Sequence, residues 1–376
     1  MPTQGDKILK VPDKIQTWRM TQPWSKDKET GKVVEGKLEK TEIPVPDLQS
    51  GEVLVEIAGC GVCHTDIGYF YFGVPTVSKP PLTLGHEISG VVVAGDKQWI
   101  GKEVIVPAVM PCHNCSICNA GRENRCLAQK MPGNSLGIYG GFSSHIPVPS
   151  RDLCLVEDRG NFDLAELAVI ADAITSPYQA CLRAELKKGD NVVVVGVTGG
   201  LGNYVAQLAK AFGARTVIGI GRNPEKLKRA LKYGADFVIN STGKDARAVR
   251  NEFREICKAN GLPHNYLWKI FEVTGSGPGQ EIALTLLSFV GKLIVVGYSA
   301  TVNQYMISRL MAFDAEIIGT WGCPPKHYRK VLEWVLNGSV KIKPFVEIRP
   351  MSKIKETFGE AHAGKLMRRV VLTPDF

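Results

Sequence analysis

The stretch that decides the fold is NVVVVGVTGGLGNYVAQLAKAFG, residues 191–213. It begins with a run of valines, which is typical of a strand buried on both faces. It continues with helical periodicity and ends at Gly213. The turn between them contains Gly196, Gly199, Gly200 and Gly202. Such a turn lets backbone N–H groups approach a pyrophosphate at a helix N-terminus. The stretch predicts a dinucleotide-binding unit; a glycine-rich turn without a ligand is the alternative.

Strands and helices keep alternating after this unit. The strand-like TVIGIG (216–221) is followed by the helical PEKLKRALKYG (224–234) and the strand-like FVIN (237–240). Later strands are expected in WKIFEVTG, KLIVVGY and EIIGTWG. Valine and isoleucine runs that alternate with helices indicate a parallel sheet covered on both faces. We therefore expect an α/β chain whose Rossmann domain, a doubly wound parallel sheet, spans 175–324.

The end of the second strand bears on the choice of cofactor. In NAD sites an acidic residue there binds the ribose 2′-hydroxyl. Here Gly221 is followed by Arg222. A guanidinium pairs well with a 2′-phosphate, which favours NADP. Alternatively, Arg222 stacks on adenine, which an NAD site also permits.

The rest of the chain has a different character. Short β-like runs broken by Gly and Pro, such as EVLVEIAGCGV and ISGVVVAG, fill the first 150 residues and predict a mostly β domain with long loops. The segment 164–184 has helical periodicity punctuated by Pro177. The tail from 325 has a helical stretch, KHYRKVLEWVLNG, followed by two β-like stretches.

Composition limits the class of protein. The chain has 376 residues and a mass of 41.0 kDa, which suggests two domains. No apolar run is long enough to span a bilayer, and the N-terminus lacks a secretory apolar core, so we expect a cytoplasmic protein without a membrane partner. The net charge of +9 is dispersed along the sequence, which argues against nucleic acid and favours an anionic small ligand.

Metal-ligand residues occur in three separate stretches. Cys63 lies in GCGVCHTDIG, His86 and Glu87 lie in LTLGHEISG, and Asp172 lies in VIADAITSP. A thiolate, an imidazole and a carboxylate can bind zinc and leave a fourth position open for substrate. Asp66 is placed to orient His86 through its other ring nitrogen. Taken singly, each of these residues has a structural explanation as a core residue, a satisfied polar group or a helix cap. Their joint occurrence beside a nucleotide fold favours a catalytic zinc site.

A second ligand set is the stretch PCHNCSICNAGRENRC, residues 111–126. Its thiols are Cys112, Cys115, Cys118 and Cys126. Four thiolates complete a tetrahedral shell and leave no open position, so we expect a structural zinc. An iron–sulfur cluster and a redox thiol group are the alternatives. The missing proline after the last cysteine and the longer final gap argue against a ferredoxin-type cluster.

The stretches GVCHTD and GHE, the four-cysteine lobe and the late glycine-rich loop occur in one order. Together they resemble the zinc-containing medium-chain alcohol dehydrogenases, over almost the whole chain. The resemblance implies a GroES-like, mostly β catalytic domain formed by 1–174 and 325–376, with the Rossmann domain between them. It also implies two zinc ions per chain, NAD as cofactor, and a homo-oligomer, a dimer or tetramer.

The resemblance gives individual residues a role. Cys63, His86 and Asp172 resemble the catalytic zinc ligands, although many relatives have cysteine where Asp172 stands. Glu87 resembles a carboxylate that exchanges onto the metal, and Thr65 the hydroxyl that takes the proton of the alcohol. The expected cofactor contacts are His64, Thr65, Ser176, Gly196, Thr198, Gly199, Gly200, Leu201, Gly202, Gly221, Arg222, Gly297 and Arg369. His64 and Arg369 resemble pyrophosphate contacts, and Ser176 a neighbour of the nicotinamide.

The sequence departs from the family at one position of the proton relay. Many relatives have a histidine five residues after the ligand cysteine, as the outlet of the relay to solvent. Gly68 occupies this position here. Beyond Thr65 the relay is then expected to continue through water.

Three stretches, 59–90, 131–146 and 305–326, resemble dehydrogenases of a ring secondary alcohol on a CoA thioester, found in anaerobic benzoyl-CoA degradation. This implies a CoA thioester substrate and, in some members, addition of water to the conjugated ring. The aromatic stretch GYFYFG (68–73) either walls an apolar substrate pocket or packs as a loop. A zinc Lewis-acid hydratase or hydrolase, a generic alcohol dehydrogenase using NADP, and a non-catalytic zinc protein are the alternative functions.

Overall fold

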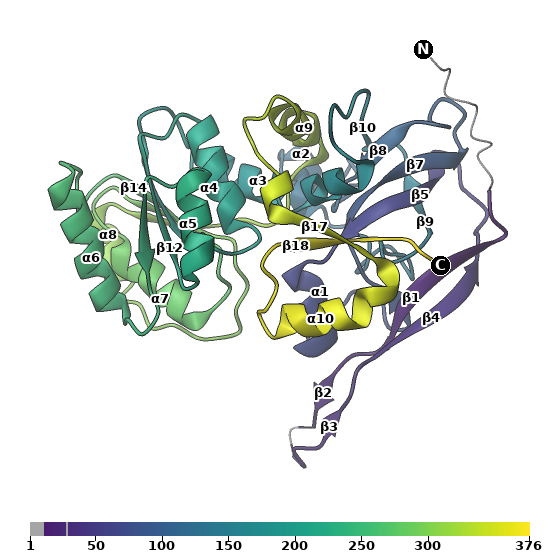
Figure 1. Ribbon diagram of the computed structural model, residues 1–376, viewed down its shortest axis with the longest axis horizontal. Helices are drawn as coiled ribbons and strands as arrows, with labels where there is room; N and C mark the ends of the chain where they lie inside the picture. The colour runs from purple at the N-terminus through teal and green to yellow at the C-terminus, as the bar shows by residue number, and fades with distance from the viewer. Residues whose placement is uncertain (1–10, 28) are drawn as a thin grey trace. The chain divides into compact units, whose positions relative to one another are not determined.

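The computed structural model describes residues 11–27 and 29–376. The chain forms two compact units (Figure 1). Unit 1 extends to Asp172 and includes Pro324–Lys330 and Ile342–Phe376. Unit 2 comprises Ala173–Cys323 and Val331–Lys341. The sequence analysis assigned all of 325–376 to the catalytic domain, whereas Val331–Lys341 groups with unit 2. In this segment Trp334 packs edge to face on Tyr178 and Phe212, and the backbone N–H of Lys341 donates to Gln207.

Unit 2 is built on a six-stranded sheet in which every neighbouring pair is parallel. Its strands, in spatial order, are β13 (Phe237–Asn240), β12 (Thr216–Gly221), β11 (Asn191–Val195), β14 (Trp268–Glu272), β15 (Lys292–Val295) and β16 (Glu316–Gly319). This order reverses between β11 and β14, as in doubly wound dinucleotide-binding sheets, where ligands bind beyond the carboxyl ends of the strands. The expected Rossmann fold is confirmed.

Helices cover both faces of this sheet, with α4 and α5 on one side of the strands and α6 and α8 on the other (Figure 1). They are α3 (Thr175–Arg183), α4 (Gly202–Ala211), α5 (Pro224–Lys232), α6 (Ala246–Ala259), α7 (Gly277–Leu286) and α8 (Ser308–Phe313). Helix α6 buries Val249, Phe253 and Cys257, which recur every four residues on one face. They join a core cluster with strand residues such as Val193 and Ile218.

Unit 1 contains a seven-stranded sheet. Its strands are β10 (Cys154–Leu155), β8 (Glu103–Val106), β7 (Glu87–Gly95), β5 (Glu52–Gly61), β18 (Arg369–Thr373) and β17 (Val346–Pro350), with β9 (His145–Pro149) paired to β5. Both β7 and β18 run antiparallel to β5, so that Gly61 faces Glu87 on one side and Val371 on the other. The carboxyl end of β5 therefore meets the amino ends of β7 and β18 at one edge.

The remaining elements complete unit 1. A second sheet has the order β4 (Lys37–Pro44), β1 (Lys14–Gln22), β6 (Leu82–Thr83), and β2 (Ser25–Lys26) pairs with β3 (Val33–Val34). The helices are α1 (His64–Tyr71), α2 (Ser116–Asn119) and α10 (Ile354–His362), with 3₁₀ turns η1 (Glu123–Arg125), η2 (Leu164–Ala171), η3 (Pro325–His327), η4 (Lys343–Phe345) and η5 (Met351–Lys353). Helix α9 (Tyr328–Leu336) crosses from unit 1 to unit 2 along the chain.

The segment 164–184 differs from the expected helix. It divides into the 3₁₀ turn η2 and the helix α3, and the chain leaves helical geometry at Asp172, whose φ is −141°. Pro177 does not interrupt a helix; it lies in the first turn of α3, where its missing N–H costs nothing.

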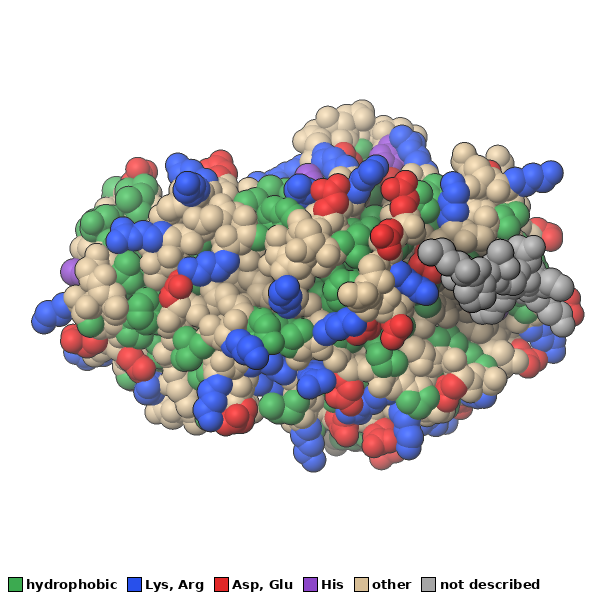
Figure 2. Space-filling model, turned by 45° about the horizontal axis from the view of Figure 1, so that its top comes forward, with side chains coloured by type: hydrophobic (Ala, Val, Ile, Leu, Met, Phe, Trp, Pro, Cys, Tyr) green, Lys and Arg blue, Asp and Glu red, His purple; other side chains and the backbone are tan. Residues whose placement is uncertain are grey.

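None of the helices in the described part of the chain is both long and apolar enough to cross a bilayer. On the face drawn in Figure 2, Lys and Arg side chains are interspersed with Asp and Glu. This agrees with the dispersed charge of the sequence.

Candidate active site and metal-binding lobe

The three predicted ligands of a catalytic metal lie together in unit 1, although they are far apart in the sequence. One ligand atom from each of Cys63, His86, Glu87 and Asp172 lies within 4.8 Å of all the others. Cys63 Sγ is 3.8 Å from Asp172 Oδ2, and His86 Nε2 is 3.6 Å from the same oxygen. Tetrahedral zinc with ordinary bond lengths separates a sulfur and an oxygen ligand by about 3.6 Å, and a nitrogen and an oxygen by about 3.4 Å. The donor set and its spacing therefore fit zinc.

The sheet brings two of these ligands together. Cys63 follows β5 and forms the N-cap of α1, while His86 immediately precedes β7, the antiparallel neighbour of β5. Gly85 makes the turn into His86 with a φ of +97°, and a Cβ there would come within 2.7 Å of Cys60 Sγ. This position requires glycine both for its backbone conformation and for its close packing.

The third ligand is positioned by a buried turn. Residues Leu167–Ala171 at the end of η2 are fully buried, and η2 packs on β5, β7 and β8. The Tyr328 hydroxyl donates to the carbonyl of Ala171 and accepts from the backbone N–H of Ala108. Because Ala171 is held on both sides in this way, the next residue, Asp172, is presented at a defined place.

Asp66 ties the two ligand-bearing loops to one another. Its carboxylate accepts hydrogen bonds from the backbone N–H of Cys63 and of Gly85, both at 3.0 Å. Its Oδ1 also lies 3.4 Å from His86 Nδ1, and the Asp66 side chain is fully buried. Burial alone would lower the pKa of His86, but the Asp66 and Asp172 carboxylates raise it well above its usual range. Asp66 thus faces the ring nitrogen that a metal on Nε2 leaves free.

Glu87 and Arg369 form an ion pair beside these ligands, with the Glu87 side chain fully buried and that of Arg369 nearly so. Arg369 Nη1 donates to Glu87 Oε1 at 2.7 Å and to the carbonyl of Val62 at 3.2 Å. Burial raises the pKa of Glu87 to about 7, against the lowering effect of Arg369. Glu87 Oε2 is buried and has no hydrogen-bond partner among the described residues. One oxygen of Glu87 is therefore held by Arg369, and the other is left for a further partner.

The other residues expected around the reacting groups lie on α1. Thr65 Oγ1 is 3.6 Å from Cys63 Sγ. The His64 side chain reaches solvent, but partial desolvation of its ring and the charges of Arg369 and His362 lower its pKa. At Gly68 a Cβ would meet only Val74, at 3.6 Å or more, so the helix has room for a side chain there.

The stretch GYFYFG is largely packed. Tyr69 and Phe70 are buried in the core of unit 1. Tyr71 stacks on His362, with ring centroids 4.1 Å apart, and Phe72 is 55% exposed. Of these four aromatic residues, two lie in the core and one stacks on another ring. Only Phe72 presents a largely exposed ring.

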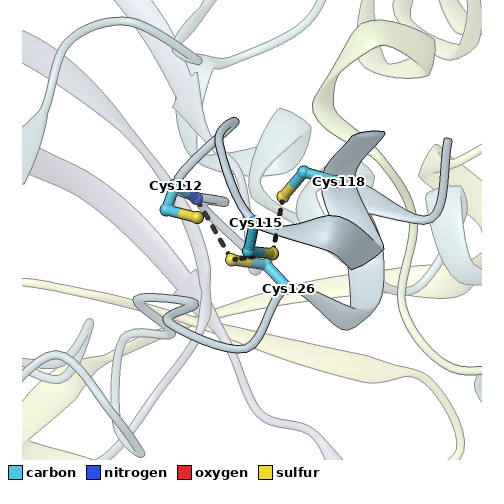
Figure 3. A group of neighbouring side chains, drawn as sticks. All are labelled: Cys112, Cys115, Cys118 and Cys126. Carbon is cyan, nitrogen blue, oxygen red and sulfur yellow. Dashed lines mark hydrogen bonds between the residues drawn. The ribbon is translucent and has the colours of Figure 1, made fainter. Parts of the chain in front are cut away.

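The four-cysteine lobe has its sulfur atoms turned toward one another (Figure 3). Cys115 Sγ lies 3.5 Å from Cys118 Sγ and 3.9 Å from Cys126 Sγ. A tetrahedral zinc with four thiolates separates the sulfurs by about 3.8 Å. The backbone N–H groups of Cys112 and Ala128 donate to Cys126 Sγ. The lobe fits a zinc with a closed shell.

The thiols of the lobe differ in their pKa values. Hydrogen bonds from the backbone N–H groups of Leu127 and Cys118 lower the pKa of Cys115 to about 6. Burial and the neighbouring thiols raise the pKa of Cys118 to about 12. A divalent cation that deprotonates all four thiols would remove this difference.

The glycine-rich loop has the geometry that close approach of a ligand requires. Gly196 has a φ of +100°, and a Cβ at Gly202 would overlap the carbonyl oxygen of Gly196. Gly199 and Gly200 are exposed just before α4. Thr198 lies in the same loop before these glycines, and Leu201, after them, is the N-cap of α4.

Gly221 lies against this loop, because a Cβ there would come 2.5 Å from Thr198 Cγ2. The side chain of the next residue, Arg222, is exposed, and its carbonyl accepts from the Thr242 hydroxyl at 2.9 Å. Ser176 is buried in the first turn of α3. The acidic residue of NAD sites is thus replaced here by an exposed guanidinium.

The sequence analysis missed Glu272. This side chain is 1% exposed at the carboxyl end of β14, beside Val195 of β11. Its Oε1 accepts from the backbone N–H of Thr274 and of Gly275, while a Cβ at Gly297 would come 2.9 Å from its Oε2. Burial raises the pKa of Glu272. An acid that ends a predicted parallel strand, in FEVTG, was the available signal.

Comparisons with known proteins agree with this arrangement. The model of the alcohol dehydrogenase GroES-like domain matches residues 49–158, and that of the zinc-binding dehydrogenases matches 200–337. An alcohol dehydrogenase of Geobacillus stearothermophilus is 31% identical over 341 residues, 89% of this chain and 95% of that protein. An NAD-dependent alcohol dehydrogenase of Sulfolobus acidocaldarius is 29% identical over 342 residues, 88% of this chain and 94% of that protein.

Among solved structures, the alcohol dehydrogenase of Aeropyrum pernix superposes with a TM-score of 0.80 at 25% identity, covering 96% of this chain and 100% of that chain. The chain belongs to the zinc-containing medium-chain alcohol dehydrogenase family.

Proposed function

We propose that this member of the family oxidises a ring secondary alcohol of a CoA thioester by hydride transfer to NAD. The observation that supports a dehydrogenase reaction is the convergence of Cys63, His86 and Asp172 at zinc-ligand spacing, with the Thr65 hydroxyl beside them. Three ligands leave one tetrahedral position for substrate. The four-cysteine lobe has no such position, and we assign it to holding its loop in shape.

The residues of the chain have distinct parts in this reaction. A bound zinc supplies Lewis acidity that lowers the pKa of an alcohol hydroxyl. The Thr65 hydroxyl would accept the hydrogen bond of the alcohol hydroxyl and pass a proton on toward solvent as it takes the alcohol's proton. A nicotinamide held by the glycine-rich loop would supply the hydride acceptor for the carbinol carbon, so that the alcohol would become a ketone. Asp66 keeps His86 in one tautomer with Nε2 toward the metal, because its carboxylate lies at Nδ1. Glu87 Oε2, which has no hydrogen-bond partner among the described residues, is the carboxylate oxygen that would be available to a metal held by the three ligands.

We assign NAD as the cofactor from the NAD-dependent relatives. Gly221 followed by the exposed Arg222 favours NADP, and this is the alternative that the assay below distinguishes. The pyrophosphate contacts are assigned to the loop Gly196–Gly202 together with His64 and Arg369. Arg369 is 6% exposed and paired with Glu87, so a contact to a phosphate requires one of its remaining N–H groups.

The finer substrate assignment rests on resemblance. The stretches 59–90, 131–146 and 305–326 resemble 6-hydroxycyclohex-1-ene-1-carbonyl-CoA dehydrogenase of anaerobic benzoyl-CoA degradation. The product would be 6-oxocyclohex-1-ene-1-carbonyl-CoA. The net charge of +9 agrees with a polyanionic thioester. Addition of water to the conjugated ring accompanies oxidation in this proposal, and the active form is a homo-oligomer, a dimer or tetramer.

The deciding experiment follows the absorbance of reduced nicotinamide with this thioester and with cyclohexanol, each with NAD and with NADP. We expect reduction of NAD with the thioester and a much weaker signal with cyclohexanol. Equal rates on both alcohols would contradict the CoA substrate. Absence of hydride transfer under every condition would contradict the dehydrogenase. Product analysis without cofactor tests for addition of water, which needs no redox partner.

A further inference from the structure

A small pocket in unit 2 has three arginines and one histidine among its twelve lining residues. It is a cavity of about 170 Å³ between α6, the end of α7 and α8. Its lining includes Arg250, Arg254, His264, Ser288, Phe289 and Arg309. None of the described residues that line it is an aspartate or a glutamate. The cavity therefore concentrates positive charge that no carboxylate of its own wall compensates.

The arginines are close enough to influence one another. Burial, together with the charges of Arg254, Arg309 and Arg247, lowers the pKa of Arg250. In the described part of the chain, none of the lining arginines forms an ion pair. Elsewhere on α6, Glu252 is already paired with Lys244. Guanidinium groups that are gathered without an anion repel each other, and a bound anion would reverse that cost.

Two polar atoms of the pocket residues lack a partner. Arg250 Nε and Ser288 Oγ are both buried and form no hydrogen bond with any described residue. A buried donor without an acceptor costs free energy comparable to a lost hydrogen bond. Both atoms belong to side chains that line the cavity, so its wall contains unmet hydrogen-bonding capacity.

Aromatic contacts fix the far side of the pocket. The rings of Phe289 and Phe313 meet edge to face, with centroids 5.0 Å apart. The guanidinium of Arg309 lies 5.0 Å from the centre of the Phe313 ring. Because Arg309 is held by this ring, its planar donors have a restricted direction, which lowers the entropy lost on binding.

We propose that this pocket binds the phosphate group of a small metabolite, with Arg250, Arg254 and Arg309 as charged donors and Ser288 as a hydroxyl donor. A phosphate offers more acceptor oxygens and more charge than a carboxylate, so it suits several guanidinium forks at once. The cavity admits one such group rather than an extended polyanion, which would need a basic stripe. The proposal does not depend on the alcohol substrate.

The first test is calorimetric titration of the zinc-loaded protein with inorganic phosphate at constant ionic strength. Saturating NAD keeps phosphate out of the glycine-rich loop. We expect saturable binding that becomes about tenfold weaker in Arg250→Gln and in Arg309→Gln, since each loses a charge-assisted hydrogen bond. Arg247→Gln is the matched control, because it removes the same charge from α6 without touching the pocket. We expect it to change the affinity about twofold or less.

The second test locates the anion. Arsenate is soaked into crystals, and its anomalous signal is expected between α6 and α8. Circular dichroism and the unfolding temperature without phosphate establish that the variants fold. Equal weakening in Arg247→Gln and Arg250→Gln would contradict the pocket, as would arsenate found only at the zinc site. Binding of a poly-aspartate peptide without binding of phosphate would assign the surface to a protein partner and overturn the proposal.

Discussion

Asp66 Oδ1 lies 3.4 Å from His86 Nδ1, and both side chains are almost fully buried. The same carboxylate also accepts from the backbone N–H of Cys63 and of Gly85. The Asp66 side chain therefore orients the imidazole of His86. It also holds together the loops at Cys63 and Gly85, which lie outside the strands β5 and β7. The first prediction follows from this relationship.

Asp66→Asn should weaken zinc binding at the candidate catalytic site by about 10- to 100-fold, because it removes the negative charge at His86 Nδ1. Zinc content after dialysis against graded chelator measures this. The control is Asp96→Asn, which replaces a partly exposed aspartate that accepts hydrogen bonds from Gln98. If Asp66→Asn retained zinc as tightly as Asp96→Asn, the assigned role of Asp66 would be wrong.

The two ligand sets should respond differently to loss of one thiol. Cys63→Ala should lower turnover by about 100- to 1,000-fold, while the fold survives. Cys115→Ser should lower the free energy of unfolding by about 3 kcal/mol or more, because the lobe loses its metal cross-link. Metal analysis should find two zinc ions in the parent protein and one in each variant. A stable but inactive Cys115→Ser protein would reverse the two assignments.

Gly61 should not tolerate a side chain. A Cβ there would overlap Glu87 Oε2 and so disturb the buried pair of Glu87 with Arg369. We expect Gly61→Ala to cost about 1–3 kcal/mol in urea unfolding. The control, Gly359→Ala, adds a methyl group in α10 with nothing within 4 Å. It should be neutral or stabilising by about 0.5–1 kcal/mol. Equal effects of the two substitutions would count against close packing at Gly61.

Gly68→His tests whether a histidine at position 68, where many relatives have one, can take part in the proton relay. The Cβ fits at ordinary contact with Val74, so the variant should fold. An imidazole there titrates near about pH 6.5 and should add an ionisation of that kind to the pH profile of turnover. Gly68→Ala controls for the loss of glycine. A Gly68→His profile identical to that of Gly68→Ala would mean that the proton does not pass this position.

Glu272 makes stability depend on pH in a defined direction. Burial raises its pKa in the folded state above the ordinary value of 4.5, so the folded protein binds this proton more tightly than the unfolded chain. Its contribution is fully present below about pH 4.5 and is lost as the pH rises through the folded pKa. Relative to Glu272→Gln, the parent protein should therefore lose stability as the pH rises from 4.5. Denaturant unfolding at several pH values measures this. Glu255→Gln, which changes an exposed side chain of α6, keeps Glu272 and should keep the slope of the parent protein, whereas the same slope in Glu272→Gln would contradict the prediction.

Much of the fold was predictable because local patterns decide it. The parallel sheet of unit 2 follows from valine-rich strands that alternate with amphipathic helices, and Gly196 and Gly202 mark the turn where the chain must approach itself closely. The break at Asp172 was not predictable in this way. The sequence is helical on both sides of it, and burial of η2 against three strands overrides that propensity.

The candidate metal ligands were predictable from their residue types, but the residues that hold these ligands in place were less predictable. Cys63 and His86 stand in recognisable motifs, whereas Tyr328, which holds the chain next to Asp172, lies 156 positions away from Asp172 in a stretch with no ligand signature. Glu272 gave only the weak signal of an acid at a strand end. Such residues act through contacts, and contacts between distant segments leave no local pattern.

The sequence by itself determined which residues can bind metal and cofactor, because thiols, imidazoles and glycine turns have fixed chemistry at any place in the chain. The tertiary structure decided where those residues meet. Antiparallel pairing of β5 with β7 and β18 sets Cys63, Glu87 and Arg369 at one sheet edge. In unit 2, the packing of α6, α7 and α8 gathers Arg250, Arg254 and Arg309 around one cavity, although the charge of the sequence is dispersed. Charge and ligand density along a chain do not determine density in space, because packing of the apolar faces decides which polar side chains become neighbours.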